Sequence, residues 1–451
     1  MVAIPTTDIF ATLKHRGDWL VGWPTATFLD AVDRKIKTLI AQPPARLLIN
    51  QADSQQFLIS FFAAVATKTP VFLGNPQWGQ EAWSSVLEQV QPDLIWGDVP
   101  LGLSVVQSTH QSETHQIPSG LIAIATGGSS GKIRFAMHTW DTLWAAAQGF
   151  YVFFESQPVH SLCLLPLHHV SGLMQVVRSF LSGGQLHTQS YSAVKQGWRG
   201  DFSEHHWFIS LVPTQLHFLV NETPHWLTQF RAVLVGGGPS QRALLDQAAA
   251  NGIPVAPCYG MTETAAMVTV LKPKLFLAGD RSCGKPLPHV QLQIQDEIVA
   301  MGSSSLFLGF YPQRQSIDFW ATQDCGQLNT DGHLEIYGRR DRMMITGGEK
   351  VAPLTVETAI WETGLVEDVV VLGIPDPHWG EAVVAMYVGD VKPVRLQRAP
   401  ELQSLSVYCR PKFFFPLPQL GRSAQGKLNY AALRQKAIKL RSQNDETYSG
   451  R

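Results

Sequence analysis

The sequence predicts an α/β fold, with a large layered N-terminal α/β domain that includes a β subdomain and a small, mobile α+β C-terminal lid domain. The first two thirds of the 451 residues alternate short apolar runs with amphipathic segments. Short alternating strands with turn signals begin near residue 290. A further unit, with its own strands and a closing helix, follows. We therefore expect an N-terminal domain at 1–339 and a C-terminal domain at 340–451.

The N-terminal domain is expected to consist of strands that alternate with helices. Short apolar runs predict strands at 46–49, 71–73, 94–96, 121–125, 162–165, 208–212, 232–235 and 255–258. Segments of helical length predict helices at 56–67, 83–90, 140–153 and 241–251. Several of the strands lead directly into Gly, Ser or His loops, and ligands bind beyond the carboxyl ends of strands in open α/β sheets. These loops are therefore where we expect the chemistry.

The β subdomain and the C-terminal domain carry distinct turn and helix signals. The segment Asn329-Thr330-Asp331-Gly332 predicts a turn before a strand at 333–337. Further strands are expected at 369–372 and 383–387. The chain ends in a predicted helix with one shared face, formed by Tyr430, Leu433, Ala437 and Leu440.

Composition excludes several classes of protein. The chain is 45% hydrophobic and only 16% charged, which excludes disorder and favours large cores. Its net charge of -1 provides no overall field for nucleic acid or an anionic membrane, so any anion is bound locally. Five cysteines without a Cys-x-x-Cys pair argue against a disulfide framework or a zinc knuckle and fit the reducing cytoplasm. No secretory signal or membrane span is expected.

Charge is divided unevenly along the chain. Residues 342–451 hold 14 Lys and Arg against 11 Asp and Glu, a net charge of +3. Within them, residues 408–441 contain eight basic residues and no acidic one. Such a run is either a solvated face with cations near a helix C-terminus or a local site for anions.

A glycine-rich loop is the most informative segment. The expected strand at 121–125 leads into Thr126-Gly127-Gly128-Ser129-Ser130-Gly131-Lys132. Backbone N–H groups and hydroxyls of such a loop can surround phosphates. A Walker A loop is excluded because Thr126 and Ile133 stand where it needs Gly and Ser or Thr. The segment therefore predicts a polyphosphate site, with a flexible connection as the alternative.

The loop resembles the phosphate-binding signature of the adenylate-forming superfamily, which contains acyl-CoA synthetases, luciferases and peptide-synthetase adenylation domains. Ile133 and Arg134 depart from its Pro and Lys. Further segments resemble motifs of this superfamily in the same order, namely 166–172, 258–264, 322–324, 337–350 and 420–427. Six ordered motifs identify the chain as a member, and they imply activation of a carboxylate with ATP.

The resemblance implies roles for residues around the nucleotide. Thr262 would contact the α-phosphate, and Glu263 would bind Mg²⁺ that bridges the phosphates. Tyr259, with Gly260 and Met261, would lie against adenine. The remaining nucleotide-binding residues would be Gly236, Gly237, Gly238 and Pro239 in the adenine pocket, Asp324 on the ribose, and Arg339. The alternatives are a core tyrosine, a plain strand-to-helix turn, and an ion pair between Asp324 and Arg339.

The resemblance also implies two half-reactions. Lys427 matches the lysine that bridges the carboxylate and the phosphate during adenylation, although a lysine before a helix is ordinarily a surface residue. Rotation of the C-terminal domain about Asp341 would then withdraw Lys427 and let CoA attack the acyl adenylate. In this second state Gly347, Gly348 and Glu349 would lie on the CoA side. Catalytic His169 would gate the acid site, with a core histidine as the alternative.

Within the superfamily, the chain most resembles the o-succinylbenzoyl-CoA synthetases of menaquinone and phylloquinone biosynthesis. The resemblance rests on residues 166–172, 210–216 and 260–265 and on a short N-terminal region. Candidate acid-pocket residues are His169, Ser171, Thr264, Thr269 and Lys272, and the second carboxylate has no assigned partner. The implied substrates are a carboxylic acid, ATP and CoA, with Mg²⁺. The alternatives are a ligase for another acid and a nucleotide-binding relative without catalysis.

Overall fold

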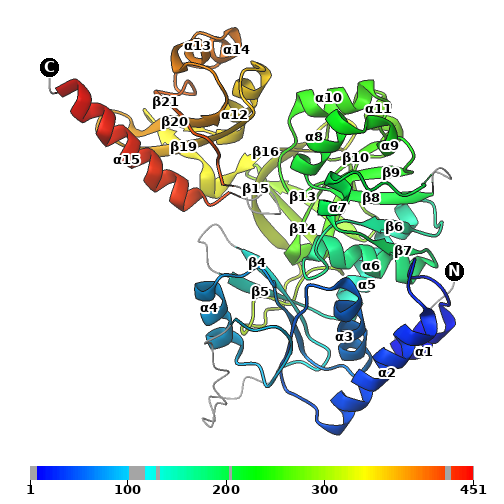
Figure 1. Ribbon diagram of the computed structural model, residues 1–451. Coiled ribbons are helices and arrows are strands. Elements are labelled where there is room, and N and C mark those ends of the chain that lie inside the picture. The colour runs from blue at the N-terminus through cyan, green and yellow to red at the C-terminus, as the bar shows by residue number, and fades with distance from the viewer. Residues whose placement is uncertain (1–7, 101–116, 128–132, 203–205, 422–427, 450–451) are drawn as a thin grey trace.

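The computed structural model describes residues 8–100, 117–127, 133–202, 206–421 and 428–449. Within these ranges the strands form four sheets, and the fourth, near the C-terminus, stands beside the others in Figure 1. No helix in the described ranges is both long enough and apolar enough to cross a membrane.

The first sheet combines four parallel strands with one antiparallel strand. In spatial order it contains β3 (Leu94–Gly97), β1 (Leu47–Asn50), β2 (Val71–Leu73), β4 (Ile122–Gly127) and β5 (Ile133–His138). Its helices are α1 (Ile9–His15), α2 (Thr25–Ala41), α3 (Ser54–Ala66) and α4 (Gln80–Val90). Side chains of α3 and α4 belong to two different cores, so the two helices cover opposite faces of the sheet.

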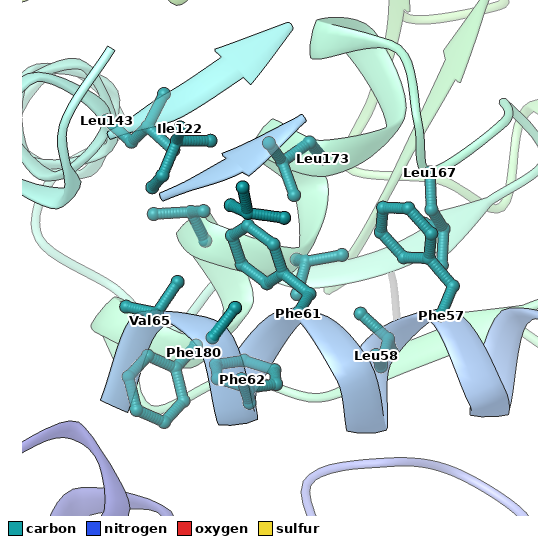
Figure 2. Close-up of a cluster of buried hydrophobic side chains, with 14 of the residues drawn as sticks. Phe57, Leu58, Phe61, Phe62, Val65, Ile122, Leu143, Leu167, Leu173 and Phe180 are labelled. Carbon is teal, nitrogen blue, oxygen red and sulfur yellow. The ribbon is translucent and has the colours of Figure 1, made fainter. Parts of the chain in front are cut away.

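Helix α3 shows how sequence decides burial in this part. The Asp53 carboxylate accepts a hydrogen bond from the Gln56 backbone N–H and so caps its N-terminus. The helix is apolar on all sides, which is typical of a buried helix. Figure 2 shows Phe57, Phe61 and Phe62 on α3 among the aliphatic side chains of neighbouring elements, and all three are buried. Together they anchor the first sheet.

The second sheet has seven strands. In spatial order they are β12 (Lys285–Pro286), β11 (Ala266–Val270), β10 (Val255–Met261), β9 (Ala232–Val235), β8 (Trp207–Leu211), β6 (His160–Cys163) and β7 (Leu186–Thr188). Helices α5 (Trp140–Phe153) and α6 (Val170–Ser182) lie between the first two sheets, since α5 contributes to the cores of both. On the other face are α7 (Tyr191–Lys195), α8 (Pro213–Glu222), α9 (Pro224–Leu227), α10 (Arg242–Ala250) and α11 (Pro273–Leu277).

The predicted β subdomain is confirmed as an antiparallel sheet of four strands. They are β13 (Val290–Gln295), β14 (Ile298–Ser303), β15 (Trp320–Leu328) and β16 (Leu334–Arg339). The predicted turn joins β15 to β16. It is stabilised by the Asn329 side chain, which accepts hydrogen bonds from the backbone of Asp331 and His333. The neighbouring side chain of His333 contacts Asp280 at 2.6 Å, which ties this turn to the second sheet.

The fourth sheet follows β16 in the chain. It contains β18 (Glu349–Val351), β17 (Met344–Thr346), β20 (Gly380–Val388), β19 (Asp368–Asp376) and β21 (Phe413–Pro416). Its helices are α12 (Pro353–Glu362), α13 (Pro393–Gln397), α14 (Pro400–Ser404) and α15 (Tyr430–Ser449). The predicted closing helix is confirmed as α15, and its Leu433 and Ala437 are buried against β19 and β20. Helices α12 and α14 cover the opposite face.

Most of the elements that we predicted are confirmed, with small shifts at their ends. The strand expected at 162–165 is β6, which lies two residues earlier. Strand β5 and helices α1, α2 and α6 were not predicted from the sequence. Helices α1 and α2 bury only some of their residues, which gives a weaker signal than a buried apolar run, whereas α6 is itself buried along most of its length and was overlooked.

Candidate active site

The carboxyl end of β4 carries the start of the phosphate loop. Thr126 and Gly127 pair with Arg134 and Ile133 of β5, so the loop joins two antiparallel strands. The Arg134 guanidinium lies 4.0 Å from the centre of the Phe310 ring. The other predicted loop residues, Gly128, Ser129, Ser130, Gly131 and Lys132, lie outside the described residues, and so does Lys427.

A tight turn between β10 and β11 presents Thr262 and Glu263. The strands approach so closely that a Cβ at Gly260 would overlap the carbonyl oxygen of Ala266, which explains why only glycine fits. The Thr264 hydroxyl bonds to the backbone of Met261 and to the Ala266 carbonyl, at 2.7–3.1 Å. This hydroxyl is buried and engaged within its own turn, so it holds Thr262 and Glu263 in place.

His138, which the sequence analysis missed, supports the same turn from the end of β5. Its Nε2 lies 2.8 Å from the Thr262 carbonyl oxygen, and its Nδ1 lies 3.0 Å from the Thr142 hydroxyl. Burial lowers the pKa of His138 to about 4, so the ring is neutral near pH 7. Nε2 then donates to the carbonyl and Nδ1 accepts from the hydroxyl. The only sequence cue is a histidine at the end of a strand, directly before a helix cap.

The Gly236 to Pro239 segment follows β9, next to the end of β10. A Cβ at Gly236 would lie 2.8 Å from the Cys258 sulfur, so a side chain has no room there. That thiol donates to the Val235 carbonyl oxygen, and burial raises its pKa to about 12. Residues 236–238 therefore leave the backbone without side chains at the end of β9, next to β10, and such a surface can accept a flat base.

Tyr259, Asp324 and Arg339 come together although they are far apart in the chain. The Tyr259 hydroxyl donates to Asp324 Oδ2 at 2.7 Å, and Arg339 Nη1 lies 3.4 Å from Asp324 Oδ1. Asp324 and Arg339 are register partners of β15 and β16. Burial raises the pKa of Asp324, while Tyr259 and Arg339 oppose that rise. Each carboxylate oxygen keeps a further acceptor site, which suits ribose hydroxyls.

The predicted hinge is held from both sides. Arg339 donates to both carboxylate oxygens of Asp341, at 2.9 and 2.7 Å, closer than its contact with Asp324. Arg342 instead donates to buried Glu357 of α12 at 3.0 Å and to the Tyr430 hydroxyl of α15 at 2.9 Å. Two arginines three residues apart are thus attached to different sheets. The backbone between them is the segment that we predict to act as the hinge.

The predicted acid-pocket residues cluster around the start of α6 and on β11. His169 is the N-cap residue of α6, and its ring centre lies 4.5 Å from that of His168. Burial and His169 lower the pKa of His168 to about 3. Ser171 is exposed on the first turn of α6. The buried Thr269 hydroxyl lacks a hydrogen-bond partner within the described ranges, so it is available to a ligand group.

Arg178 on α6 is a second residue that the sequence analysis missed. Its side chain is only 3% exposed, and its guanidinium lies 4.3 Å from the centre of the Phe150 ring. Burial lowers its pKa to about 10, so it remains charged near pH 7. In the described part of the chain no carboxylate bonds to it, and its Nε has no partner. A buried cation without an anion is costly, which marks Arg178 as a site for an anionic group. An arginine inside the apolar run 170–182 was the available cue.

The predicted CoA side lies at the turn between β17 and β18. Gly347 and Gly348 both have positive φ, and Glu349 is exposed. A Cβ at Gly347 would lie 3.2 Å from the Trp379 ring and 3.4 Å from the Tyr408 ring. Lys412 Nζ lies 4.4 Å from the centre of the Trp379 ring. A cavity of about 290 Å³ opens beside these residues, lined by Gln397, Leu402, Gln403, Val407, Arg410, Pro411, Lys412 and Phe414.

The basic residues of the run at 408–441 fall into two groups in the structure. Arg434 donates to the Gly373 carbonyl oxygen at 2.8 Å, and Arg441 pairs with Asp376 at 2.6 Å. These two arginines attach α15 to the hairpin of β19 and β20. Arg410 and Lys412 instead line the cavity.

The metal prediction rests on Glu263 alone. In the described ranges no three His, Cys, Asp or Glu residues are grouped as a metal site. Mg²⁺ is commonly held by one or two carboxylates together with substrate phosphates and water, so a single Glu on a turn that packs against β4 and β5 fits that ion.

The sequence and the fold of this chain are similar to those of several known proteins. The AMP-binding enzyme family matches residues 121–300. A 2-succinylbenzoate–CoA ligase of Bacillus cytotoxicus is 30% identical over 359 residues, 73% of each chain. One from Listeria monocytogenes serotype 4b is 27% identical over 413 residues, 86% of this chain and 88% of its own. The structure of MenE, the o-succinylbenzoate CoA synthetase of Bacillus subtilis, with the acyl adenylate OSB-AMP matches with a TM-score of 0.81 at 22% identity, covering 94% and 97% of the two chains. That protein has also been solved with ATP and magnesium.

Proposed function

The chain belongs to the AMP-binding enzyme family, and we propose that it is an ATP-dependent ligase that joins o-succinylbenzoate to CoA, with release of AMP and pyrophosphate. The observation that carries the proposal is the convergence of Tyr259, Asp324 and Arg339 at the end of β10, directly before the Glu263 turn. The named relatives support the acid and CoA as substrates.

In the first half-reaction the acid is adenylated. An oxygen of the succinyl carboxylate attacks the α-phosphorus of ATP, the bond to the bridging oxygen breaks, and pyrophosphate leaves. Thr126 to Lys132 would surround the phosphates, Glu263 would hold Mg²⁺ on them, and Asp324 would accept the ribose hydroxyls. Lys427 would offset the charge of the two approaching anions.

We assign the second carboxylate of o-succinylbenzoate to Arg178. A benzoate group in this interior would supply the anion that the buried guanidinium lacks. Phe150 lies against the guanidinium and gives the site an apolar wall. The Thr269 hydroxyl is a further candidate donor, whereas the hydroxyl of Thr264 is engaged in its turn. Selectivity for this acid would follow, because an acid without the second carboxylate leaves Arg178 unpaired.

In the second half-reaction the CoA thiolate attacks the acyl carbon, the bond to AMP breaks, and the thioester forms. Rotation of residues 340–451 about Asp341 would bring the Gly347–Gly348 turn to the acyl adenylate. Arg410 and Lys412 would then meet CoA phosphates at the cavity beside Trp379.

A substrate panel tests the proposal. Pyrophosphate release is measured with o-succinylbenzoate, benzoate, succinate and fatty acids, with and without CoA. The expected result is a strong preference for o-succinylbenzoate and a CoA-dependent thioester product. A preference for another acid would leave an acyl-CoA ligase but overturn the assigned substrate, and an inert protein would overturn the activity.

A further inference from the structure

The turn between β19 and β20 is built around the carboxylate of Asp376. Its Oδ1 accepts hydrogen bonds from the backbone N–H groups of His378, at 2.8 Å, and Trp379, at 2.9 Å. The Trp379 carbonyl in turn accepts from the Gly347 N–H at 2.9 Å. A short chain of bonds therefore runs from Asp376 to the glycine turn on the CoA side.

The Trp379 ring lies between the glycine turn and the Lys412 ammonium. The ring is in close contact with Gly347 and lies under the Lys412 ammonium, while the His378 ring stands edge-on to it, 4.7 Å between centres. A displacement of Trp379 would therefore change both the glycine turn and the position of Lys412. No residue of the adenylation site takes part in these contacts.

The other oxygen of Asp376 is bound by a distant part of the chain. Arg441, in the second half of α15, donates to Asp376 Oδ2 at 2.6 Å. The Asp376 side chain is only 6% exposed and that of Arg441 19%, so the pair is shielded from water. The Arg441 guanidinium also lies 4.6 Å from the centre of the Phe413 ring, which fixes its direction.

We propose that Asp376 is a positioning residue for the thioester half-reaction: its ion pair with Arg441 holds the Trp379 turn against Gly347 and so shapes the surface that receives CoA. The inference rests on the proposed function. Asp376 does not touch a substrate itself. Its effect should therefore fall on the use of CoA and leave adenylation unchanged.

Full-length Asp376→Asn and Arg441→Met variants test the inference in two separate assays. ATP–pyrophosphate exchange with o-succinylbenzoate reports adenylation, and thioester formation from supplied acyl adenylate reports the second half. The KM for CoA should rise about tenfold in each variant, while exchange stays within about twofold of the parent protein. The double variant should be no worse than either single one, because both remove the same pair. Arg441→Lys should recover part of the loss.

A control is Asp246→Asn, which removes a more exposed aspartate that pairs with Arg281 at 2.7 Å and with Arg242. It should leave the KM for CoA unchanged. An unchanged KM in Asp376→Asn and Arg441→Met, or equal losses in both half-reactions, would overturn the inference while the parent protein still forms the thioester. A parent protein that forms no thioester would overturn the proposed function and this inference with it. If Asp376→Asn does not fold, Arg441→Lys and Arg441→Met carry the same test.

Discussion

The nucleotide part of the site and the CoA face are built in opposite ways. Tyr259, Asp324 and Arg339 lie at the junction of two sheets and are already bonded to one another. At the proposed CoA face, Gly347 and Glu349 are exposed, and the Trp379 backbone N–H donates to Asp376, which pairs with Arg441. Under the proposed function, adenylation would depend on groups arranged before ATP binds, whereas CoA capture would depend on how the C-terminal part is held and placed.

The largest effect is expected from the replacement of Lys427, and its absence would contradict the contrast between the nucleotide site and the CoA face. Lys427 belongs to the C-terminal part by sequence, yet we expect it to act in adenylation. Lys427→Ala should lower the rate of adenylation by at least about 10³-fold, because a cation that offsets two anions is lost. Thioester formation from supplied acyl adenylate should stay near the parent rate. Equal losses in pyrophosphate exchange and thioester formation would contradict the division between the two parts.

Arg178→Met tests whether the buried guanidinium in the N-terminal part binds the second carboxylate of o-succinylbenzoate. We expect kcat/KM for o-succinylbenzoate to fall about 100-fold, since a buried charged contact is worth roughly 2–5 kcal/mol. For an acid with a single carboxylate, kcat/KM should stay the same or rise, because no unpaired cation remains. The panel of acids measures both values. An equal loss for every acid would point to a damaged fold and not to selectivity.

Motifs found in the sequence indicated which residues belong together, whereas residues that matter only through packing were missed. The resemblance to the superfamily implied that Tyr259, Asp324 and Arg339 belong to one site, and the structure brings these three side chains together, while their contact with a nucleotide stays a prediction. His138 and Arg178 were missed, because each matters only through what other elements bring to it. His138 acts on a carbonyl 124 residues away, and the lack of a counter-ion at Arg178 is invisible until α5 and α6 are packed.

The fold prediction has the same limit. Buried apolar runs such as β9 were located to the residue, since burial on both faces leaves a continuous apolar signal. Strand β5 includes Arg134 and His138 among its apolar residues, so its pairing with β4 could not be predicted from its own residues. The role of the basic residues at 408–441 also depends on tertiary contacts, such as the pair of Arg441 with Asp376, which the sequence does not reveal.

Acid should destabilise the N-terminal part first. The pKa of His138 is lowered from 6.5 to about 4, so the unfolded chain binds the proton more tightly than the folded one. Stability contributed by the neutral ring is therefore lost as pH falls from about 6.5 toward 4. Between pH 7 and 5 the free energy of unfolding should decrease by about 2 kcal/mol for His138 alone. Burial lowers the pKa of His168 and His289 as well, which adds to the loss.

Urea unfolding at the two pH values measures this change. In His138→Gln the dependence on pH should be weaker by about the same 2 kcal/mol. The C-terminal part offers an internal control, because its one histidine, His378, is exposed and Asp376 keeps its lowered pKa below this range. Limited proteolysis at pH 5 should therefore cut the N-terminal part before the C-terminal part, and the reverse order would contradict the assignment.

The smallest effects are expected from Asp324 and Tyr259, and they test whether the hydrogen bonds of the proposed nucleotide site are arranged before ATP binds. Asp324→Asn removes the charge but keeps an oxygen for one ribose hydroxyl, so the KM for ATP should rise about tenfold while the KM for CoA is unchanged. Tyr259→Phe removes only the donor to Asp324, and it should raise the KM for ATP less. Both values come from pyrophosphate exchange at varied ATP. A larger effect from Tyr259→Phe than from Asp324→Asn would mean that the aromatic ring and its orientation, and not the carboxylate, dominate nucleotide binding.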